Sequence, residues 1–178
     1  MRSRMTVNRS DSVRLHCAAD ANPLPFETVW SRNGSTVLRQ EHLAHLHIDH
    51  AQLGDSGFYT CTVHNRFHNN LTSDGSSVIE LIVQNRPIIE TTNSKLAGEI
   101  GQTIALVCRA SGRPKPDIVW KRHDRTIPCS ETRDDRCYLE IFNMTAADFG
   151  LYRCVAENLL GREEWIYTVV SRGECHRS

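Results

Sequence analysis

The stretch Asp55-Ser56-Gly57-Phe58-Tyr59-Thr60-Cys61 returns later in the chain as Asp148-Phe149-Gly150-Leu151-Tyr152-Arg153-Cys154. In each copy an earlier cysteine, Cys17 or Cys108, lies 44 or 46 residues before the final one. A tryptophan follows each of these earlier cysteines, at Trp30 and Trp120. The copies lie about 90 residues apart, which is the length of a small repeated domain. The recurrence of several residue types at nearly equal spacing predicts one domain present twice.

The segments around these anchors alternate between apolar and polar residues. Val13, Leu15 and Cys17 alternate with polar neighbours, and Ile104, Leu106 and Cys108 do the same in the second copy. A period of two, bounded by Gly, Asn and Pro, is the pattern of a half-buried antiparallel strand. No window keeps a helical apolar stripe over three turns, so an all-β fold is predicted.

The 178 residues divide into two domains of similar size. We expect domain 1 over residues 1–84 and domain 2 over residues 85–178, the latter with a short polar tail. The connection Val83-Gln84-Asn85-Arg86-Pro87 has almost no slack, and its proline stiffens it. We therefore expect the domains to lie end to end.

The repeated pattern Cys…Trp…Asp-x-Gly-x-Tyr-x-Cys resembles the immunoglobulin superfamily over nearly the whole chain. Two further segments, Ser111-Gly112-Arg113-Pro114-Lys115-Pro116 and Ala156-Glu157-Asn158-Leu159-Leu160-Gly161, resemble loops of its I-set. The first copy departs from the I-set pattern in a longer, more polar final hairpin. The resemblance implies two tandem I-set Greek-key β-sandwiches of the kind found in cell-surface adhesion and recognition receptors.

The same resemblance implies roles for the anchor residues. Disulfides Cys17–Cys61 and Cys108–Cys154 would join the two sheets, with Trp30 and Trp120 packed on their sulfurs. Tyr59 and Tyr152 would be core residues whose hydroxyls bond the backbone of the preceding loop. Asp55 and Asp148 would be buried carboxylates that need a cation, and we expect Arg39 and Arg133 to supply it.

Three of the seven cysteines remain. Cys129 and Cys137 flank a charged loop, and a local disulfide is the interpretation that an oxidising compartment favours. A zinc site is the alternative, although this spacing without nearby histidines is not typical of zinc. Cys175, in the polar tail, is predicted to be unpaired within the chain; an intermolecular bridge, a lost partner or a free thiol all remain open.

Glycosylation sequons and cysteine content together favour an extracellular location. The sequons begin at Asn8, Asn33, Asn70 and Asn143. The chain has neither a run of about 18 apolar residues nor the apolar region of a signal peptide, so no direct membrane insertion is expected. We expect a segment of a longer ectodomain, membrane-anchored or secreted, in which Met1 is an expression start.

Charge and motif content argue against several function classes. Lys and Arg number seven against eight Asp and Glu in residues 1–84, and fourteen against thirteen in residues 85–178, which totals 21 of each sign. Neither domain has the excess of positive charge that nucleic acid binding requires. Phosphate-binding glycine loops, nucleophile elbows and zinc-protease motifs are missing, so neither enzymatic activity nor a cofactor is predicted.

Two clusters suggest weaker hypotheses, each set against a solvated surface. His42, His45, His47 and His50 could hold a metal only with further ligands, and an exposed strand face is favoured. The basic residues of domain 2 could make a weak contact with heparin-like sulfated glycans, but interleaved acidic residues favour ordinary surface. These basic residues are Arg109, Arg113, Lys115, Lys121, Arg122 and Arg125.

The favoured function is binding of an extracellular protein, either a different ligand or a second copy of the chain, by a segment of an adhesion or recognition receptor. Alternatives are a secreted regulator that captures a growth factor or peptide hormone, and a spacer without a partner. In such receptors the sheet carrying the tryptophan strand often binds, and strand alternation predicts which residues face outward there. The candidate face comprises Val29, Leu38, Phe58, Thr60, Thr62, His64 and Phe67.

Peptide mapping without reduction should find the links 17–61, 108–154 and 129–137. Loss of either long-range link should lower the free energy of unfolding by about 2–5 kcal/mol, and loss of the short one should matter less, because disulfides closing longer loops restrict the unfolded chain more. A 129–175 or 137–175 link in the main species would contradict the local pairing.

Overall fold

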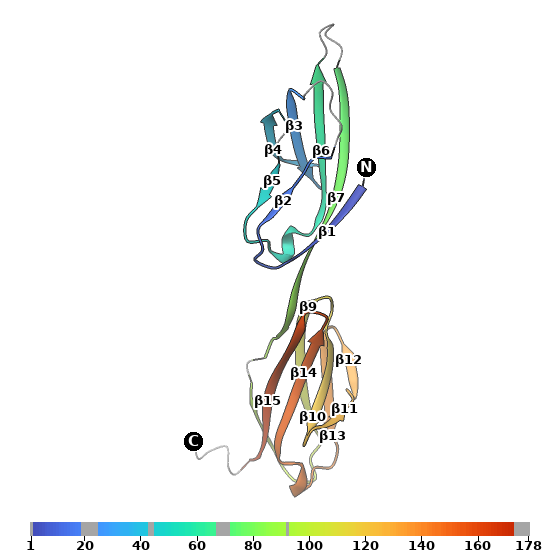
Figure 1. Cartoon of the computed structure of the whole chain (residues 1–178). Helices are drawn as coiled ribbons and strands as arrows, with labels where there is room; N and C mark the ends of the chain where they lie inside the picture. Colours follow the sequence, from blue (N-terminus) through green and yellow to red (C-terminus); the bar gives the residue numbers. More distant parts are fainter. Residues whose placement is uncertain (1, 19–24, 43–44, 67–71, 92, 173–178) are drawn as a thin grey trace. The chain divides into compact units, whose positions relative to one another are not determined.

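The computed structural model describes residues 2–18, 25–42, 45–66, 72–91 and 93–172. The chain forms two compact units, Met1–Gln84 and Asn85–Ser178. Both are built from β-strands, apart from one short 3₁₀ turn in each (Figure 1). The structure differs from the sequence-based predictions at three residues. The side chain of Leu38 does not face outward, and the motif aspartates do not pair with Arg39 and Arg133.

Unit 1 packs two sheets. In the larger, β1 pairs in parallel with β7, and β7, β6, β3 and β4 follow in antiparallel order. In the smaller, β2 pairs with β5. The strands are β1 (Arg2–Asn8), β2 (Val13–Leu15), β3 (Glu27–Arg32), β4 (Ser35–Glu41), β5 (Leu46–Ile48), β6 (Gly57–Arg66) and β7 (Thr72–Ile89), with the turn η1 (Leu53–Asp55).

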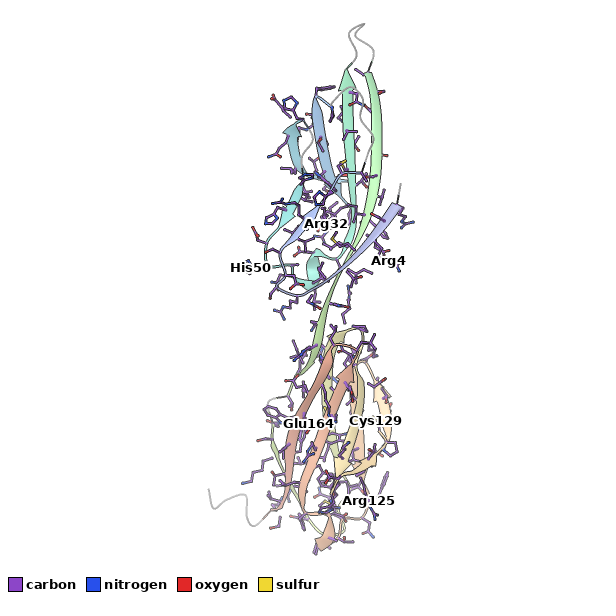
Figure 2. All side chains as sticks on the ribbon, in the orientation of Figure 1. Arg4, Arg32, His50, Arg125, Cys129 and Glu164 are labelled. Atoms are coloured by element: carbon purple, nitrogen blue, oxygen red, sulfur yellow. A yellow bond between two sulfur atoms is a disulfide. The ribbon has the colours of Figure 1, made fainter. Side chains whose placement is uncertain are left out.

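The core of unit 1 follows from strand alternation. Trp30 and Cys61 are neighbours on β3 and β6, and both are fully buried. Leu15 and Val63 pack in the same cluster. Cys17 is bonded to Cys61, which joins the two sheets. The Arg32 side chain, labelled in Figure 2, lies at the end of β3.

Unit 2 repeats this plan, with longer strands at β9 and β13 than at their counterparts β2 and β5. Its five-stranded sheet has the order β11-β10-β14-β15-β8. Its other sheet joins β12, β13 and β9 with residues 85–89 of β7. The strands are β8 (Lys95–Gly98), β9 (Ile104–Arg113), β10 (Asp117–Arg122), β11 (Arg125–Ile127), β12 (Glu131–Arg133), β13 (Arg136–Ile141), β14 (Gly150–Asn158) and β15 (Gly161–Ser171), with the turn η2 (Ala146–Asp148).

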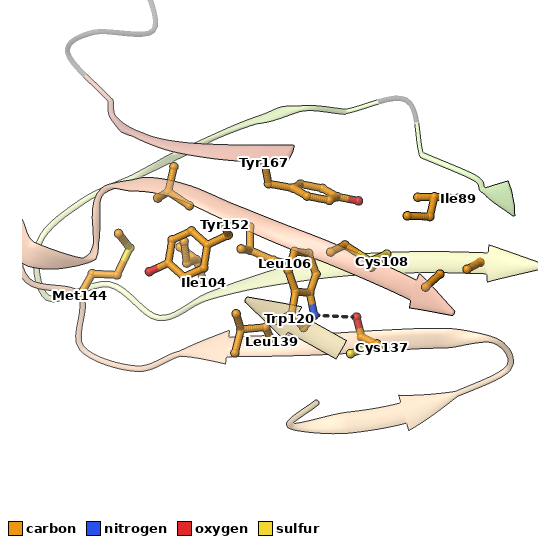
Figure 3. Packing of buried hydrophobic residues seen from close by; sticks show 14 residues of the cluster. Ile89, Ile104, Leu106, Cys108, Trp120, Cys137, Leu139, Met144, Tyr152 and Tyr167 are labelled. Carbon is orange, nitrogen blue, oxygen red and sulfur yellow. Dashed lines mark hydrogen bonds between the residues drawn. A yellow bond between two sulfur atoms is a disulfide. The ribbon is translucent and has the colours of Figure 1, made fainter. Parts of the chain in front are cut away.

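Trp120 lies at the centre of the unit 2 core (Figure 3). It is fully buried, and its ring meets that of Tyr167 edge to face with centroids 5.0 Å apart. Its indole N–H donates to the carbonyl of Cys137 at 3.4 Å, so the polar atom of the ring has a partner. Cys108 and Cys154 are bonded across the sheets, and Cys154 lies opposite Trp120 on β14.

The third disulfide, Cys129–Cys137, has one end inside this core. Cys137 is fully buried and lies opposite Cys108 on adjacent strands. The residues between the two cysteines include β12 and the turn that leads into β13, so the charged segment is largely a hairpin at the sheet edge.

The glycine of the repeated motif has a backbone reason. Gly57 and Gly150 have φ angles of 152° and 120°, a region that residues with a Cβ rarely adopt. Both stand at the entry to the strand that carries the motif tyrosine and cysteine.

We predict that Trp30→Ala and Trp120→Ala each destabilise their unit by about 3–5 kcal/mol, because each removes a large, fully buried ring. Trp165→Ala is the matched control, since that side chain is 36% exposed. Urea unfolding followed by circular dichroism gives the three values. A cost for Trp120→Ala no larger than that for Trp165→Ala would contradict the packing described.

Candidate protein-binding faces

The sequence-predicted face lies on the outer side of β3 and β6 in unit 1. Val29 pairs with Thr62, and Thr60 lies one outward position further along β6. Val29, Thr60, Thr62 and His64 are partly exposed, whereas the intervening Trp30, Tyr59, Cys61 and Val63 are buried. Phe58 is 41% exposed. The structure therefore brings five of the predicted residues onto one face.

Leu38 does not belong to this face, and its prediction was wrong. It lies opposite Trp30 and packs against the core of unit 1. The register between β3 and β4 shifts after Trp30, and Val37 takes an exposed position instead. Such a bulge changes which residues point outward, so counting by twos from Trp30 cannot place β4. Phe67 lies outside the residues that the structure describes.

Charged side chains border this face at both ends. At one end His64 Nδ1 lies 2.7 Å from Asp74 Oδ1, and Arg39 contacts Glu27 at 2.8 Å. At the other end the Arg2 guanidinium lies over the Phe58 ring, 4.7 Å from its centroid. Arg2 thus covers part of Phe58, the largest apolar side chain of this face. The surface between the two charged ends is small and consists mainly of threonines.

The corresponding sheet of unit 2 exposes larger apolar groups. Leu151 and Ile166 are 60% and 51% exposed. Arg153 pairs with Ile166, and Leu151 pairs with the next outward position, Thr168. Leu151 and Ile166 are therefore diagonal neighbours on one face of β14 and β15. The alternation that places Phe58 outward in the first motif also places Leu151 outward in the second, so the second motif already indicates an exposed apolar residue on this face.

These two residues line a pocket of about 260 Å³ with basic side chains from β10 and the turn after it. Arg153, on its rim, is 3.4 Å from Glu164 and 3.8 Å from Asp124. Lys121 also lines the pocket, and among the described residues it forms no ion pair. The pocket thus combines an apolar wall with Lys121, a cation that has no carboxylate partner among the described residues.

Arg122 and Tyr152, which line the pocket, belong to an arginine, aspartate and tyrosine group. Arg122 Nη1 is 3.4 Å from Asp148 Oδ1, and its guanidinium lies 4.8 Å from the centre of the Tyr152 ring. The Tyr152 hydroxyl donates to the Asp148 carbonyl at 2.9 Å. Arg122 also donates to the backbone carbonyls of Ala147 and Phe149, which fixes the turn to the strand.

Unit 1 has the same group, built from Arg32, Asp55 and Tyr59. Arg32 Nη1 is 3.9 Å from Asp55 Oδ1, and the Tyr59 hydroxyl donates to the Asp55 carbonyl at 2.9 Å. In both units the arginine comes two residues after the core tryptophan, a repeated spacing that could have revealed it.

The predicted partners Arg39 and Arg133 were therefore wrong. Arg39 pairs with Glu27, and Arg133 pairs with Glu131, in each case on the surface of its own unit. Neither aspartate is fully buried, since Asp55 and Asp148 side chains keep 32% and 25% exposure.

Hydrogen bonding explains the ionisation of Asp148. The backbone N–H of Thr145 donates to Asp148 Oδ2 at 2.8 Å and the Thr145 hydroxyl at 2.7 Å. These bonds, with a smaller contribution from Arg122, lower the pKa of Asp148 below its usual value. Burial instead raises the pKa of the Tyr152 hydroxyl, which keeps it protonated as a donor.

The histidine cluster lies on the β2–β5 sheet and its flanks. His16 and His45 rings meet with centroids 4.4 Å apart, and His47 Nε2 is 2.8 Å from Asp49 Oδ1. His45 and His47 are both exposed. Within the described ranges, no three His, Cys, Asp or Glu residues are placed to hold a metal ion.

Three of the basic residues proposed for glycan contact already have carboxylate partners, and one of them is Arg122, which pairs with Asp148 as described above. Arg109 is 3.4 Å from Glu90, and Lys115 is 2.8 Å from Asp135. The hydrogen bond to Asp135 raises the pKa of Lys115. These pairings neutralise half of the basic set, which does not favour a heparin site.

Three of the predicted glycosylation sites are exposed at turns or strand ends, namely Asn8, Asn33 and Asn143. Asn33 and Asn143 have φ angles of 52° and 48°. Asn70 and Cys175 lie outside the described residues. None of the helical turns in the described part of the chain has the length or apolar content to cross a bilayer.

Each unit has the same disulfide, core tryptophan and tyrosine turn. A match to a known protein family covers both units. The Immunoglobulin domain family matches residues 2–65 and 86–158. The chain belongs to the immunoglobulin domain family.

Curated relatives of this immunoglobulin chain include human "Leucine-rich repeats and immunoglobulin-like domains protein 1", 29% identical over 89% of this chain and 15% of the relative. Chicken "Neural cell adhesion molecule 1" is 29% identical over 89% of this chain and 16% of the relative. The chain thus spans only about a sixth of the length of these relatives. Among solved structures, the complex of Dpr2 Ig1-Ig2 with DIP-Theta Ig1-Ig3 matches with a TM-score of 0.66 and 26% identity, over 94% of this chain and 61% of the other.

We predict that Asp148→Asn makes the melting temperature of unit 2 less sensitive to a fall in pH. Because the folded-state pKa of Asp148 is lowered, its carboxylate stabilises the fold above the unfolded pKa of about 3.9. That contribution is lost as the pH falls through the folded-state pKa. Thermal melts between about pH 6 and pH 2 should show a lower melting temperature for the variant at pH 6 and a shallower decline in acid.

Asp117→Asn is the matched control, because Asp117 is exposed and forms no ion pair with the described residues. It should melt like the parent across the series. An acid decline for Asp148→Asn as steep as that of the parent would contradict the role assigned to Asp148.

Proposed function

We propose that this chain is an extracellular, non-enzymatic segment of a cell adhesion or recognition receptor that binds another protein. Tandem immunoglobulin domains bind one another in the Dpr2 and DIP-Theta complex, and one relative is named for cell adhesion. Both facts belong to those proteins, and they support the same class of function here. The chain has both disulfides and N-glycosylation sequons, and this combination supports the extracellular location.

The observation that carries the proposal is the outer face of β14 and β15 in unit 2. Leu151 and Ile166 expose more than half of their accessible surface beside a pocket of about 260 Å³. Adjacent exposed aliphatic side chains on a sheet gain free energy when a partner removes them from water. By contrast, the largest apolar group of the unit 1 face, Phe58, already lies under Arg2.

The charges around Leu151 and Ile166 define the chemistry of the partner. Lys121 lacks a carboxylate among the described residues, whereas Arg153 has Glu164 and Asp124. A partner segment with a carboxylate beside apolar side chains would satisfy both the cation and the aliphatic wall. The partner is therefore a protein surface of mixed apolar and acidic character, on a second copy or on another protein.

We predict that Leu151→Asp combined with Ile166→Asp abolishes partner binding and leaves the fold nearly unchanged. Both side chains are largely exposed, so their loss should alter the free energy of unfolding by about 0.5 kcal/mol or less each. A negative charge in a buried apolar contact should raise the Kd of the complex by a hundredfold or more. Each factor of about 10 in Kd corresponds to about 1.4 kcal/mol of binding free energy. Aggregation of beads that display the chain measures self-binding, and a panel of extracellular domains measures binding to other proteins.

Phe58→Asp combined with Thr62→Asp is the matched variant on the face predicted from the sequence. It should bind like the parent. Loss of binding in this variant alone would place the site on unit 1, and loss in neither would exclude both faces. No binding by the parent in either assay would favour the spacer function instead.

A further inference from the structure

One end of unit 2 exposes two large apolar side chains. Ile100 and Phe142 are each 68% exposed, and among the large apolar residues of the described ranges only Leu159 is more exposed. Neither lies on the sheet face considered above: Ile100 is in the turn after β8, and Phe142 directly follows β13.

Backbone hydrogen bonds bring these two segments together. The N–H of Gly101 donates to the carbonyl of Met144 at 2.7 Å, and the N–H of Met144 donates to the carbonyl of Gln102 at 2.9 Å. Met144 is buried, which anchors the segment to the core. The turn that carries Ile100 therefore runs alongside residues 142–144.

Asn143 directly follows Phe142 in the chain, and its side chain lies close to Gly101, the residue after Ile100. Its Oδ1 atom would be 3.9 Å from a Cβ placed on Gly101, so its side chain lies against the turn that follows Ile100. Asn143 is exposed, and its amide forms no hydrogen bond with the residues that the structure describes. It is the first residue of the sequon Asn143-Met144-Thr145.

We propose that Asn143 carries an N-linked glycan whose first sugar packs over Phe142 and Ile100 and stabilises this end of unit 2. The proposal rests on the extracellular location contained in the proposed function. In the attachment step, Asn143 Nδ2 bonds to C1 of the sugar of a lipid-linked oligosaccharyl pyrophosphate. The C1–O bond to the pyrophosphate breaks, the lipid pyrophosphate leaves, and the amide nitrogen loses one proton.

The attachment point makes the glycan the natural occupant of this patch. A pyranose ring presents C–H groups on its faces, and these can cover an aromatic or aliphatic side chain and remove it from water. Because the sugar is tethered at Asn143, its effective concentration over the neighbouring side chains is high, and no separate binding event is required.

The other described sequons lack this arrangement. Asn33 stands in the turn Arg32-Asn33-Gly34-Ser35, whose members offer no large apolar side chain. The side chain of Asn8 is already engaged, since its Oδ1 accepts a hydrogen bond from Gln84 Nε2 at 3.1 Å. Among the described sequons, only Asn143 directly follows a largely exposed aromatic side chain, Phe142.

The test uses the full chain, expressed behind a secretion leader in cells that add N-glycans. Glycopeptide mass spectrometry should find Asn143 occupied. Asn143→Gln should lower the melting temperature of unit 2 by about 4–8 °C, the shift typical of losing one modest contact in a domain of this size. Trimming the glycan to its first sugar should leave the melting temperature unchanged, whereas complete enzymatic removal should lower it as the substitution does.

Two comparisons separate this contact from other effects. Asn33→Gln is the matched control, because Asn33 also has a positive φ angle, so both substitutions carry a similar backbone cost. It should shift the melting temperature of unit 1 by about 2 °C or less. In a background of Ile100→Ser with Phe142→Ser, Asn143→Gln should no longer lower the melting temperature of unit 2 beyond that small cost.

An unoccupied Asn143 beside an occupied Asn33 would overturn the proposal. So would equal melting temperatures with and without the glycan, or an undiminished glycan effect in the serine background. The leader directs the chain through the secretory route, so these results do not depend on partner binding. A failure of the proposed receptor function would be seen separately, in the bead and panel assays.

Discussion

The packing of a tryptophan beside a disulfide that joins two sheets is the constraint on which each unit depends. Trp30 lies opposite Cys61, and Trp120 opposite Cys154, with all four residues fully buried. Once these positions face inward, strand alternation determines the direction of the neighbouring side chains wherever the strand is regular. The outward faces of the central strands are therefore a consequence of the core, and evolution can vary them without disturbing it.

Alternation from those anchors could be read from the sequence alone, and it predicts the exposed side chains of β6. It fails where the strand is irregular. The bulge at Val37 places Leu38 against the core. No residue type in Ser35–Glu41 predicts a bulge at this position. The partners of Asp55 and Asp148 were mispredicted for another reason: ion pairs join separate strands, and proximity in sequence to Arg39 or Arg133 says little about distance in space.

The two units share one arginine, aspartate and tyrosine group and differ in the outer faces of their sheets. Arg32 and Arg122 fasten the tyrosine turn to the tryptophan strand in the same way. On its outer face, unit 1 has threonines between charged ends, whereas unit 2 has Leu151 and Ile166 beside Lys121. A duplicated scaffold with unlike surfaces allows one domain to specialise in recognition while its neighbour keeps the same internal structure.

The position of Cys137 has a consequence for how unit 2 matures. Because Cys137 lies opposite Cys108 on adjacent strands, its thiol meets two potential partners while the chain is being oxidised. A Cys108–Cys137 bond would leave Cys154 and Cys129 without their native partners, so the sheets must come together around Trp120 before the sulfurs commit. Thiol–disulfide exchange can correct an early error only while the sulfurs remain accessible. Native pairing in this unit therefore requires Cys154 and Cys129 to reach Cys108 and Cys137 before those two adjacent sulfurs bond to each other.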